Sequence, residues 1–351
     1  MIGLFEDESR SDPPSGSHFA STLDGFRRFA QRLVILTVGF ALFASIPSHA
    51  GQADVNVPMR RDIGATTIDR AGAAPDDVVT VTELVRQEIE MLRRELGVKD
   101  FPPRAESHDS RRPIHIYVKA LEVMSKVAAV QRRLGVPESS VPGMPLAGLS
   151  SDDVLLVLQD IVGGIRAIKT QMVIESGVDT GTLSTPRTLS AAYKNLADSS
   201  AMLDGLVGRG LTTEQVFQGV RSIAEDLNLV AAELQVALEA NAPVVADVRE
   251  SADIAQQALR AAYKVVLLQS RLGLEPSAVP TLTLVRVTPA EAYDLIGILR
   301  AELARIKWHL GIDMPAPEIV ELSQARNLVD VFAQMLLVVR NLDLLAAGIE
   351  T

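Results

Sequence analysis

The segment KVAAVQRRLGVPESSVP at residues 126–142 returns as KVVLLQSRLGLEPSAVP at residues 264–280. The two copies align without a gap at an offset of 138 residues, and nine of the 17 positions are identical. The register continues beyond them, because residues 151–155 (SDDVL) correspond to residues 289–293 (PAEAY). Self-similarity at a fixed offset indicates a tandem duplication, in which two copies of one structure follow each other along the chain.

A shorter period of about 38 residues lies inside each half of the chain. In the first half, the segment at residues 75–79 (PDDVV) recurs at 113–117 (PIHIY), 151–155 and, more loosely, 189–193 (LSAAY). In the second half it recurs at 213–217 (TEQVF), 251–255 (SADIA), 289–293 and, shifted by one residue, 328–332 (LVDVF). The chain after residue 74 is therefore interpreted as eight copies of one unit.

Each unit is predicted to be a helix of about 20 to 25 residues followed by a loop. The first unit has an apolar residue at every third or fourth position: Val78, Val81, Val85, Ile89, Leu92 and Leu96. Thr288, Pro289 and Glu291 match a helix start with a capping box and a proline in the first turn. Glycines that can take the left-handed conformation mark the helix ends: Gly97, Gly135, Gly273 and Gly311.

A helix with one apolar stripe needs partners, and four such helices can bury their stripes against one another. The sequence therefore predicts an all-α fold, a tandem duplication of two four-helix bundles. The period breaks at residues 207–211 (VGRGL), so the bundles are expected to span residues 75–207 and 212–351. A continuous α-solenoid is the alternative. Loops such as residues 136–149 are longer than bundle hairpins need, which fits either a loop over a bundle end or a crossover between parallel helices.

Composition narrows the classes of function. The 351 residues include 34 Lys+Arg and 44 Asp+Glu, which gives a net charge of −10. An acidic chain is unsuited to binding nucleic acid or an anionic membrane surface. The sequence contains no cysteine, which excludes disulfides, thiol catalysis and thiolate-bound zinc or iron–sulfur clusters.

The first 50 residues match an export signal. Three arginines between positions 27 and 32 precede an apolar run at residues 33–46, and small side chains favour cleavage after Ala50. Because a bilayer-spanning helix needs about 20 apolar residues, a retained anchor is the weaker alternative, and no stable membrane insertion is expected after cleavage. Residues 51–74 are predicted to be a flexible leader. The mature protein is expected to be periplasmic, or secreted where no outer membrane exists.

The fifth residue of the unit is aromatic in five of the eight copies: Tyr117, Tyr193, Phe217, Tyr293 and Phe332. One turn into each helix, these side chains could line a shared cavity at a bundle end, with hydroxyl groups directed at a ligand. The alternative is that each ring closes the end of its own core beneath the following loop. These five residues are the candidate ligand-binding residues of the sequence.

No constellation for catalysis or metal binding is found in the sequence. After residue 50, the histidines are His108, His115 and His309, and none has the Glu-x-x-His or His-x-x-x-His spacing of a helical metal site. Nucleophile-elbow, phosphate-loop and zinc-protease motifs are missing. The pair Gly163–Gly164 is expected to permit close helix packing or a bend. No enzymatic activity, metal or cofactor is therefore predicted.

Two functional hypotheses remain. The first is an exported, non-catalytic helical-repeat protein that acts as an interaction scaffold or adaptor for an unknown protein partner in the cell envelope. Its contact surface would be the repeated Pro-, Ser- and Val-rich loops at residues 136–142 and 274–280. The alternative is a helical bundle that binds or senses a small molecule in a cavity lined by the repeated aromatic residues.

Overall fold

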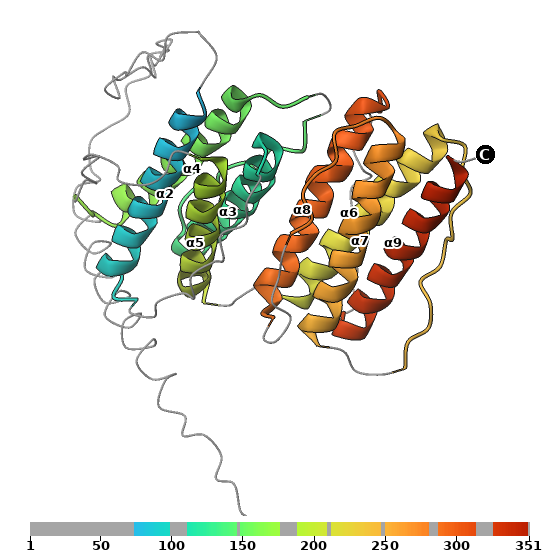
Figure 1. Ribbon diagram of the computed structural model, residues 1–351. Coiled ribbons are helices and arrows are strands. Elements are labelled where there is room, and N and C mark those ends of the chain that lie inside the picture. The colour runs from blue at the N-terminus through green and yellow to red at the C-terminus, as the bar shows by residue number, and fades with distance from the viewer. Residues whose placement is uncertain are drawn as a thin grey trace, which may run out of the picture. The chain divides into compact units, whose positions relative to one another are not determined.

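Eight helices and no strands make up the described residues of the computed structural model, which confirms the all-α prediction (Figure 1). The described ranges are 74–98, 111–145, 148–175, 188–208, 212–246, 250–280, 287–313 and 326–349. The helices are α2 (Pro75–Glu95), α3 (Pro113–Leu134), α4 (Ser151–Gln171), α5 (Leu189–Val207), α6 (Thr213–Glu233), α7 (Ser251–Arg271), α8 (Pro289–His309) and α9 (Leu328–Gly348). Each helix begins at the residue where the sequence repeat restarts.

Side-chain caps explain why the helices begin at these residues. Before α4, Ser150 Oγ accepts a hydrogen bond from the Asp153 backbone N–H at 3.3 Å, and Asp153 Oδ2 accepts one from the Ser150 backbone N–H at 2.8 Å. The same reciprocal pattern opens α6, α8 and α9, and α8 adds the predicted proline. Each cap satisfies amide groups that have no partner within the helix.

The helix ends follow one geometry with two kinds of residue. The predicted glycines Gly97, Gly135, Gly273 and Gly311 all have a positive φ, between 69° and 75°. The same position after α4 and α6 is held by Val173 and Gln235, each with a φ of 56°. In every case the next residue donates a backbone hydrogen bond to the last turn of the helix. The turn is therefore common to both halves, although its glycine is not.

The helices pack as two four-helix bundles, here called bundle 1 (α2–α5) and bundle 2 (α6–α9). In bundle 1, both α2 and α3 pack against α4 and α5, and in bundle 2, both α6 and α7 pack against α8 and α9. Each bundle has its own apolar core. Among the described residues α2 does not pack against α3, which excludes a solenoid in which each helix contacts the next.

All four helices of bundle 1 run in the same direction. Near the helix starts, Asn195 Nδ2 of α5 lies 3.4 Å from Thr82 Oγ1 of α2. In the second halves of the helices, Lys169 Nζ of α4 contacts a Glu88 oxygen of α2 at 2.7 Å. Gln131 Nε2 of α3 donates to the Gly164 carbonyl of α4 at 3.2 Å. Starts therefore meet starts and ends meet ends.

Bundle 2 repeats this parallel arrangement. Lys307 of α8 contacts Asp226 of α6 at 2.7 Å, and both lie in the second halves of their helices. Gln269 Nε2 of α7 donates to Glu302 Oε2 of α8 at 2.6 Å. Lys264 of α7 pairs with Asp343 of α9.

Parallel helices require connections that return along the bundle. The chain between α3 and α4 does so, because Ser139 near its beginning is held by Gln131 at the end of α3, and the Gly143 carbonyl accepts a hydrogen bond from Tyr117 near the start of α3. The distance between Tyr117 Oη and the Gly143 oxygen is 2.9 Å. The long loop is therefore a crossover, and the length of the loops in the repeat has its explanation.

Three sequence predictions fall partly or wholly outside the described residues. Residues 1–73 contain the predicted export signal and all of the predicted leader except its last residue. The predicted boundary between the bundles includes residues 209–211, which are also outside the described ranges, and the domain limits stay a prediction. None of the described helices is long and apolar enough to span a lipid bilayer.

A polar cavity where the two bundles meet

The two bundles belong to one compact unit, residues 67–351, and they meet through α3 and α8. His115, at the start of α3, faces Glu302 in the second half of α8, whereas Lys119 one turn later faces Asp294 near the start of α8. The two helices are therefore antiparallel. A short link between α5 and α6 reverses the chain direction, so bundle 2 runs opposite to bundle 1.

An apolar cluster closes one end of this contact. Ile114 of α3 packs against Ala301 and Ala304 of α8, and Met144 and Trp308 cover the cluster. The Trp308 indole N–H donates to the Pro145 carbonyl at 3.1 Å. The single tryptophan thus fixes the crossover segment of bundle 1 to a helix of bundle 2.

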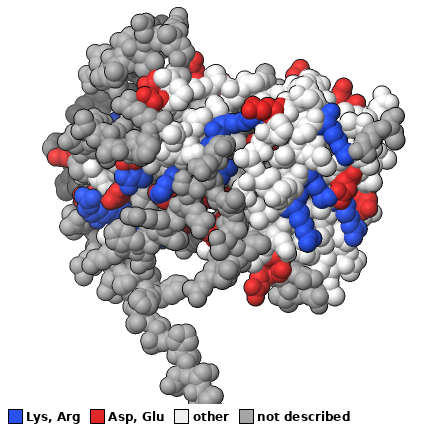
Figure 2. Space-filling model, in the orientation of Figure 1, with Lys and Arg blue, Asp and Glu red and all other residues white. Residues whose placement is uncertain are grey.

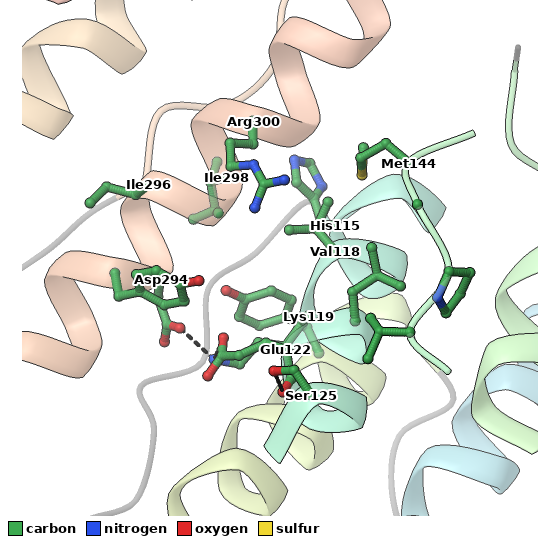
Figure 3. A pocket seen from close by; sticks show the side chains of 17 residues that line it. His115, Val118, Lys119, Glu122, Ser125, Met144, Asp294, Ile296, Ile298 and Arg300 are labelled. Carbon is green, nitrogen blue, oxygen red and sulfur yellow. Dashed lines mark hydrogen bonds and ion pairs between the residues drawn. The ribbon is translucent and has the colours of Figure 1, made fainter. Parts of the chain in front are cut away.

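Beside this cluster lies a cavity of about 270 Å³ (Figure 3). Its lining comes from both bundles: Val118, Lys119, Glu122 and Ser125 of α3, Met144 of the crossover, and Asp294, Ile296, Ile298 and Arg300 of α8 are among the residues that surround it. Tyr193 of α5 and Tyr293 of α8 complete the wall. The volume suits one small molecule.

A buried ion-pair network forms the floor of the cavity. Lys119 Nζ lies 2.5 Å from Asp294 Oδ1 across the bundle contact and 2.8 Å from Glu122 Oε2 on its own helix (Figure 3). Glu122 Oε1 accepts a hydrogen bond from Ser200 at 2.5 Å. Lys126 extends the network to Asp204 of α5 at 2.7 Å. Each of these buried charges has an opposite charge within contact distance, as burial requires.

The network controls the protonation of its members. Burial opposes ionisation of Glu122, but the neighbouring Lys119 and Lys126 outweigh it and hold its pKa at about 2. Burial raises the pKa of Asp294, and Lys119 only partly offsets this effect. Glu122 is therefore the firm counter-ion of Lys119, and Asp294 is the carboxylate that takes up a proton more readily.

A second cross-bundle pair joins His115 and Glu302. His115 Nδ1 accepts the Arg112 backbone N–H at 2.9 Å, so a neutral ring carries its proton on Nε2, which lies 2.8 Å from Glu302 Oε1. Burial lowers the pKa of His115 below its ordinary value. Burial alone would raise the pKa of Glu302, but His115, Ser277 and Arg305 together lower it to about 2. The pair is a neutral imidazole against a carboxylate.

Two of the five predicted aromatic residues meet at the cavity, and they come from different bundles. Neither the Tyr193 nor the Tyr293 hydroxyl makes a hydrogen bond within the described residues, although both side chains line the cavity. Burial raises the pKa of both hydroxyls, so both stay protonated. The Arg111 guanidinium lies over the Tyr193 ring, 4.3 Å from its centroid. Arg300 Nε is buried and also makes no hydrogen bond.

The other three predicted aromatic residues lie elsewhere. Tyr117 is buried in the core of bundle 1, and its hydroxyl is used by the Gly143 carbonyl. Phe332 is buried in the core of bundle 2. Phe217 lines a second hollow of about 650 Å³ on bundle 2, with the Arg326 guanidinium 4.9 Å from its ring centroid. The five residues therefore do not share one cavity at a bundle end.

The charged residues of the cavity are those that the sequence analysis missed. Lys119, Glu122 and Lys126 follow one another at helical spacing on α3, which is a local signal for a stripe of charge within a helix that is otherwise buried. Asp294 carries no such signal, because its partner Lys119 lies 175 residues away in the sequence. Within the described part of the chain, no group of three or more His, Cys, Asp and Glu residues is arranged to hold a metal ion.

Comparison with known proteins identified no matching family model, no similar curated protein and no similar solved structure. On the face of the molecule shown in Figure 2, the described basic and acidic side chains are interspersed rather than gathered by sign. The cavity between the bundles is therefore the feature from which a function is argued.

Proposed function

We propose that the protein is an exported, non-catalytic binding protein that holds one small, uncharged, polar molecule in the cavity between its two bundles. The observation that carries the proposal is the pair of cavity-facing tyrosine hydroxyls, Tyr193 and Tyr293, which have no hydrogen-bond partner in the described residues. Buried polar groups in proteins are normally paired. A ligand oxygen that accepts from both would satisfy them.

Charge balance supports an uncharged ligand. The cavity contains the cations Lys119 and Arg300 and the carboxylates Glu122 and Asp294. Because these charges cancel and Lys119 is already paired with both carboxylates, a charged ligand would bring an uncompensated charge into a buried site. The free donors on two tyrosines and on Arg300 favour a molecule rich in hydrogen-bond acceptors, such as a polyol, a sugar or an amide.

The proposal excludes catalysis on chemical grounds. The ionisable side chains Lys119, Glu122 and Asp294 neutralise one another, so none is poised as a free general base or nucleophile. The localisation belongs to the same proposal: the sequence of residues 1–50 supports export to the periplasm or out of the cell.

The test is native mass spectrometry of the mature chain purified from its own host, compared with the mass of the denatured chain. We expect a mass excess of a few hundred daltons that disappears on denaturation. The identified molecule is then titrated calorimetrically against Tyr193→Phe and Tyr293→Phe, which should each weaken binding by about tenfold, since a hydrogen bond to a buried donor is lost. Tyr263→Phe, on an exposed face of α7, is the matched control. Unchanged affinity in both cavity variants would refute the proposal.

The scaffold hypothesis has a separate observation in its favour. Large apolar side chains are exposed on two helices that do not form the bundle contact: Leu156 on α4, and Tyr263 and Leu267 on α7. The loops expected to bind a partner are instead partly used in the fold, because the backbone N–H groups of Ser139 and Ser277 are held by glutamines of α3 and α7. Protein contacts are therefore proposed for helix faces rather than for these loops.

A further inference from the structure

We propose that the exposed faces of α7 and α4 bind each other between copies of the chain, which joins molecules head to tail. This inference does not depend on the proposed ligand. It rests on the duplication, since α7 stands 138 residues after α3, and α4 stands 138 residues before α8. The helices that form the contact between bundles thus have their counterparts on the two outer sides of the molecule.

The outer face of α4 matches the contact face of α8 position by position. On α8, the residues at the contact are Asp294, Gly297, Ala301, Ala304 and Trp308. Their counterparts on α4 are all exposed: Leu156, Gln159, Gly163, Arg166 and Thr170. Gly163 replaces Ala301, and a side chain there would meet no atom within 4 Å. The α4 face therefore keeps an open position with a small residue at its centre, where another helix can approach closely.

The outer face of α7 matches the contact face of α3 in the same way. The exposed residues Gln256, Arg260 and Tyr263 stand where α3 has Val118, Glu122 and Ser125, which lie at the bundle contact and its cavity. Leu267 continues this exposed row by one further turn. Tyr263 is 67% exposed and Leu267 is 46% exposed, which is unusual for large apolar side chains on an otherwise polar surface.

The substitutions between the two faces complement each other. If α7 packs on α4 as α3 packs on α8, Leu156 stands at the position of Asp294, and Tyr263 stands at the position of Ser125. Both Asp294 and Ser125 line the polar cavity of the bundle contact. In the junction between copies, these positions carry two large apolar side chains that can fill the space, so a dry contact replaces a polar cavity. Burial of both side chains from water drives the association.

The geometry makes the assembly open-ended. The two surfaces differ, so the contact is heterologous, and each added copy presents a new α7 face at one end and a new α4 face at the other. The chain itself already shows that bundles of this kind join in series through one helix from each. The partner inferred from these faces is a second copy of this chain.

The test is sedimentation equilibrium of the mature chain over a wide concentration range. We expect a mass that increases with concentration, without saturating at a dimer. Leu156→Glu on α4 and Tyr263→Glu on α7 should each raise the dissociation constant of the junction by about tenfold or more, since each places a charge in an apolar contact. Circular dichroism checks that each variant keeps its helical content, because both positions are exposed.

A complementation experiment separates a head-to-tail contact from a symmetric one. Leu156→Glu retains an intact α7 face and Tyr263→Glu retains an intact α4 face, so an equimolar mixture of the two should form dimers and nothing larger. Leu344→Glu, at an exposed apolar position of α9, is the control and should associate like the unmodified chain. A monomeric unmodified chain at all concentrations, equal loss of association in the control, or a mixture that stays monomeric would each overturn the proposal.

Discussion

The two bundles share their internal contacts but differ at the helix that faces outward. The pair Lys126–Asp204 in bundle 1 corresponds to Lys264–Asp343 in bundle 2. The side chains of the first pair are 9% and 24% exposed, and those of the second are 27% and 58% exposed, because only α3 is covered by the other bundle. Duplication has thus preserved the pairs that hold each bundle, while the surroundings of these pairs have changed.

The largest expected effect tests the charge that only bundle 1 carries. Lys119→Met leaves Glu122 and Asp294 buried without their shared cation, and we expect a loss of about 3–5 kcal/mol in the free energy of unfolding, measured by urea denaturation. Gln257 occupies the matching position in bundle 2 and is also buried. Gln257→Met, which leaves no charge unpaired, should lose less than about 1.5 kcal/mol. Equal losses would show that the ion pairs are dispensable.

The next effect compares the shared pair directly. Lys126→Met should destabilise the protein by about 3 kcal/mol, since it strands Asp204 and removes a partner of Glu122 in a buried network. Lys264→Met removes the exposed counterpart and should lose less than about 1 kcal/mol, because exposed ion pairs contribute little. Denaturation curves of the two variants in the same buffer measure the difference. A reversed order would contradict the role assigned to coverage by α8.

A smaller, pH-dependent effect concerns His115, whose place in bundle 2 is taken by Asp253. Because burial lowers the pKa of His115 in the folded protein, the unfolded chain binds the proton more readily. The stability that neutral His115 contributes is therefore present above its ordinary pKa of about 6.5 and is lost as the pH falls below it. Stability measured against pH should decline less steeply in His115→Gln than in the unmodified chain between about pH 6.5 and the range where carboxylates titrate, near about 4.5. Parallel curves would rule out this role.

The smallest effect is at a helix end that the two bundles terminate differently. Val173 and Gly311 are equivalent positions with φ values of 56° and 71°. A β-branched residue is strained in this left-handed region, and glycine is not. Val173→Gly should raise the free energy of unfolding by about 1 kcal/mol, and Gly311→Val should lower it by a similar or larger amount. Thermal unfolding of both variants provides the measurement. Destabilisation by Val173→Gly would disprove the strain.

Much of the fold could be read from the sequence because its signals are local. Caps and terminal glycines fix where a helix begins and ends, and the repeat at residues 126–142 and 264–280 fixes how many times the pattern occurs. Helix direction could not be read, because an apolar stripe looks the same whether its neighbour is parallel or antiparallel. The crossover became evident only from contacts such as that of Tyr117 with Gly143.

The candidate site was predictable only in part, for the same reason. The aromatic position of the repeat contained Tyr193 and Tyr293, and its periodicity could be seen in the sequence. Which tyrosines share a cavity depends on the contact of α3 with α8, and that contact relies on pairs such as Lys119 with Asp294 that are distant in the chain. A charge on a helix reveals neither its depth nor its partner before the bundles are placed together.

The crossover connections have a consequence for how the chain reaches its fold. A helical hairpin forms early because its two helices are neighbours in sequence, yet here α2 packs against α4 and α5 but not against α3. Contacts that hold the bundle join residues 81 positions apart, as in Lys169 with Glu88, or 113 apart, as in Asn195 with Thr82. Closing such long loops lowers chain entropy before any core forms, and folding rates fall as the sequence separation of contacts rises. We therefore expect this protein to combine helical secondary structure with the slow folding kinetics more common in β-rich domains.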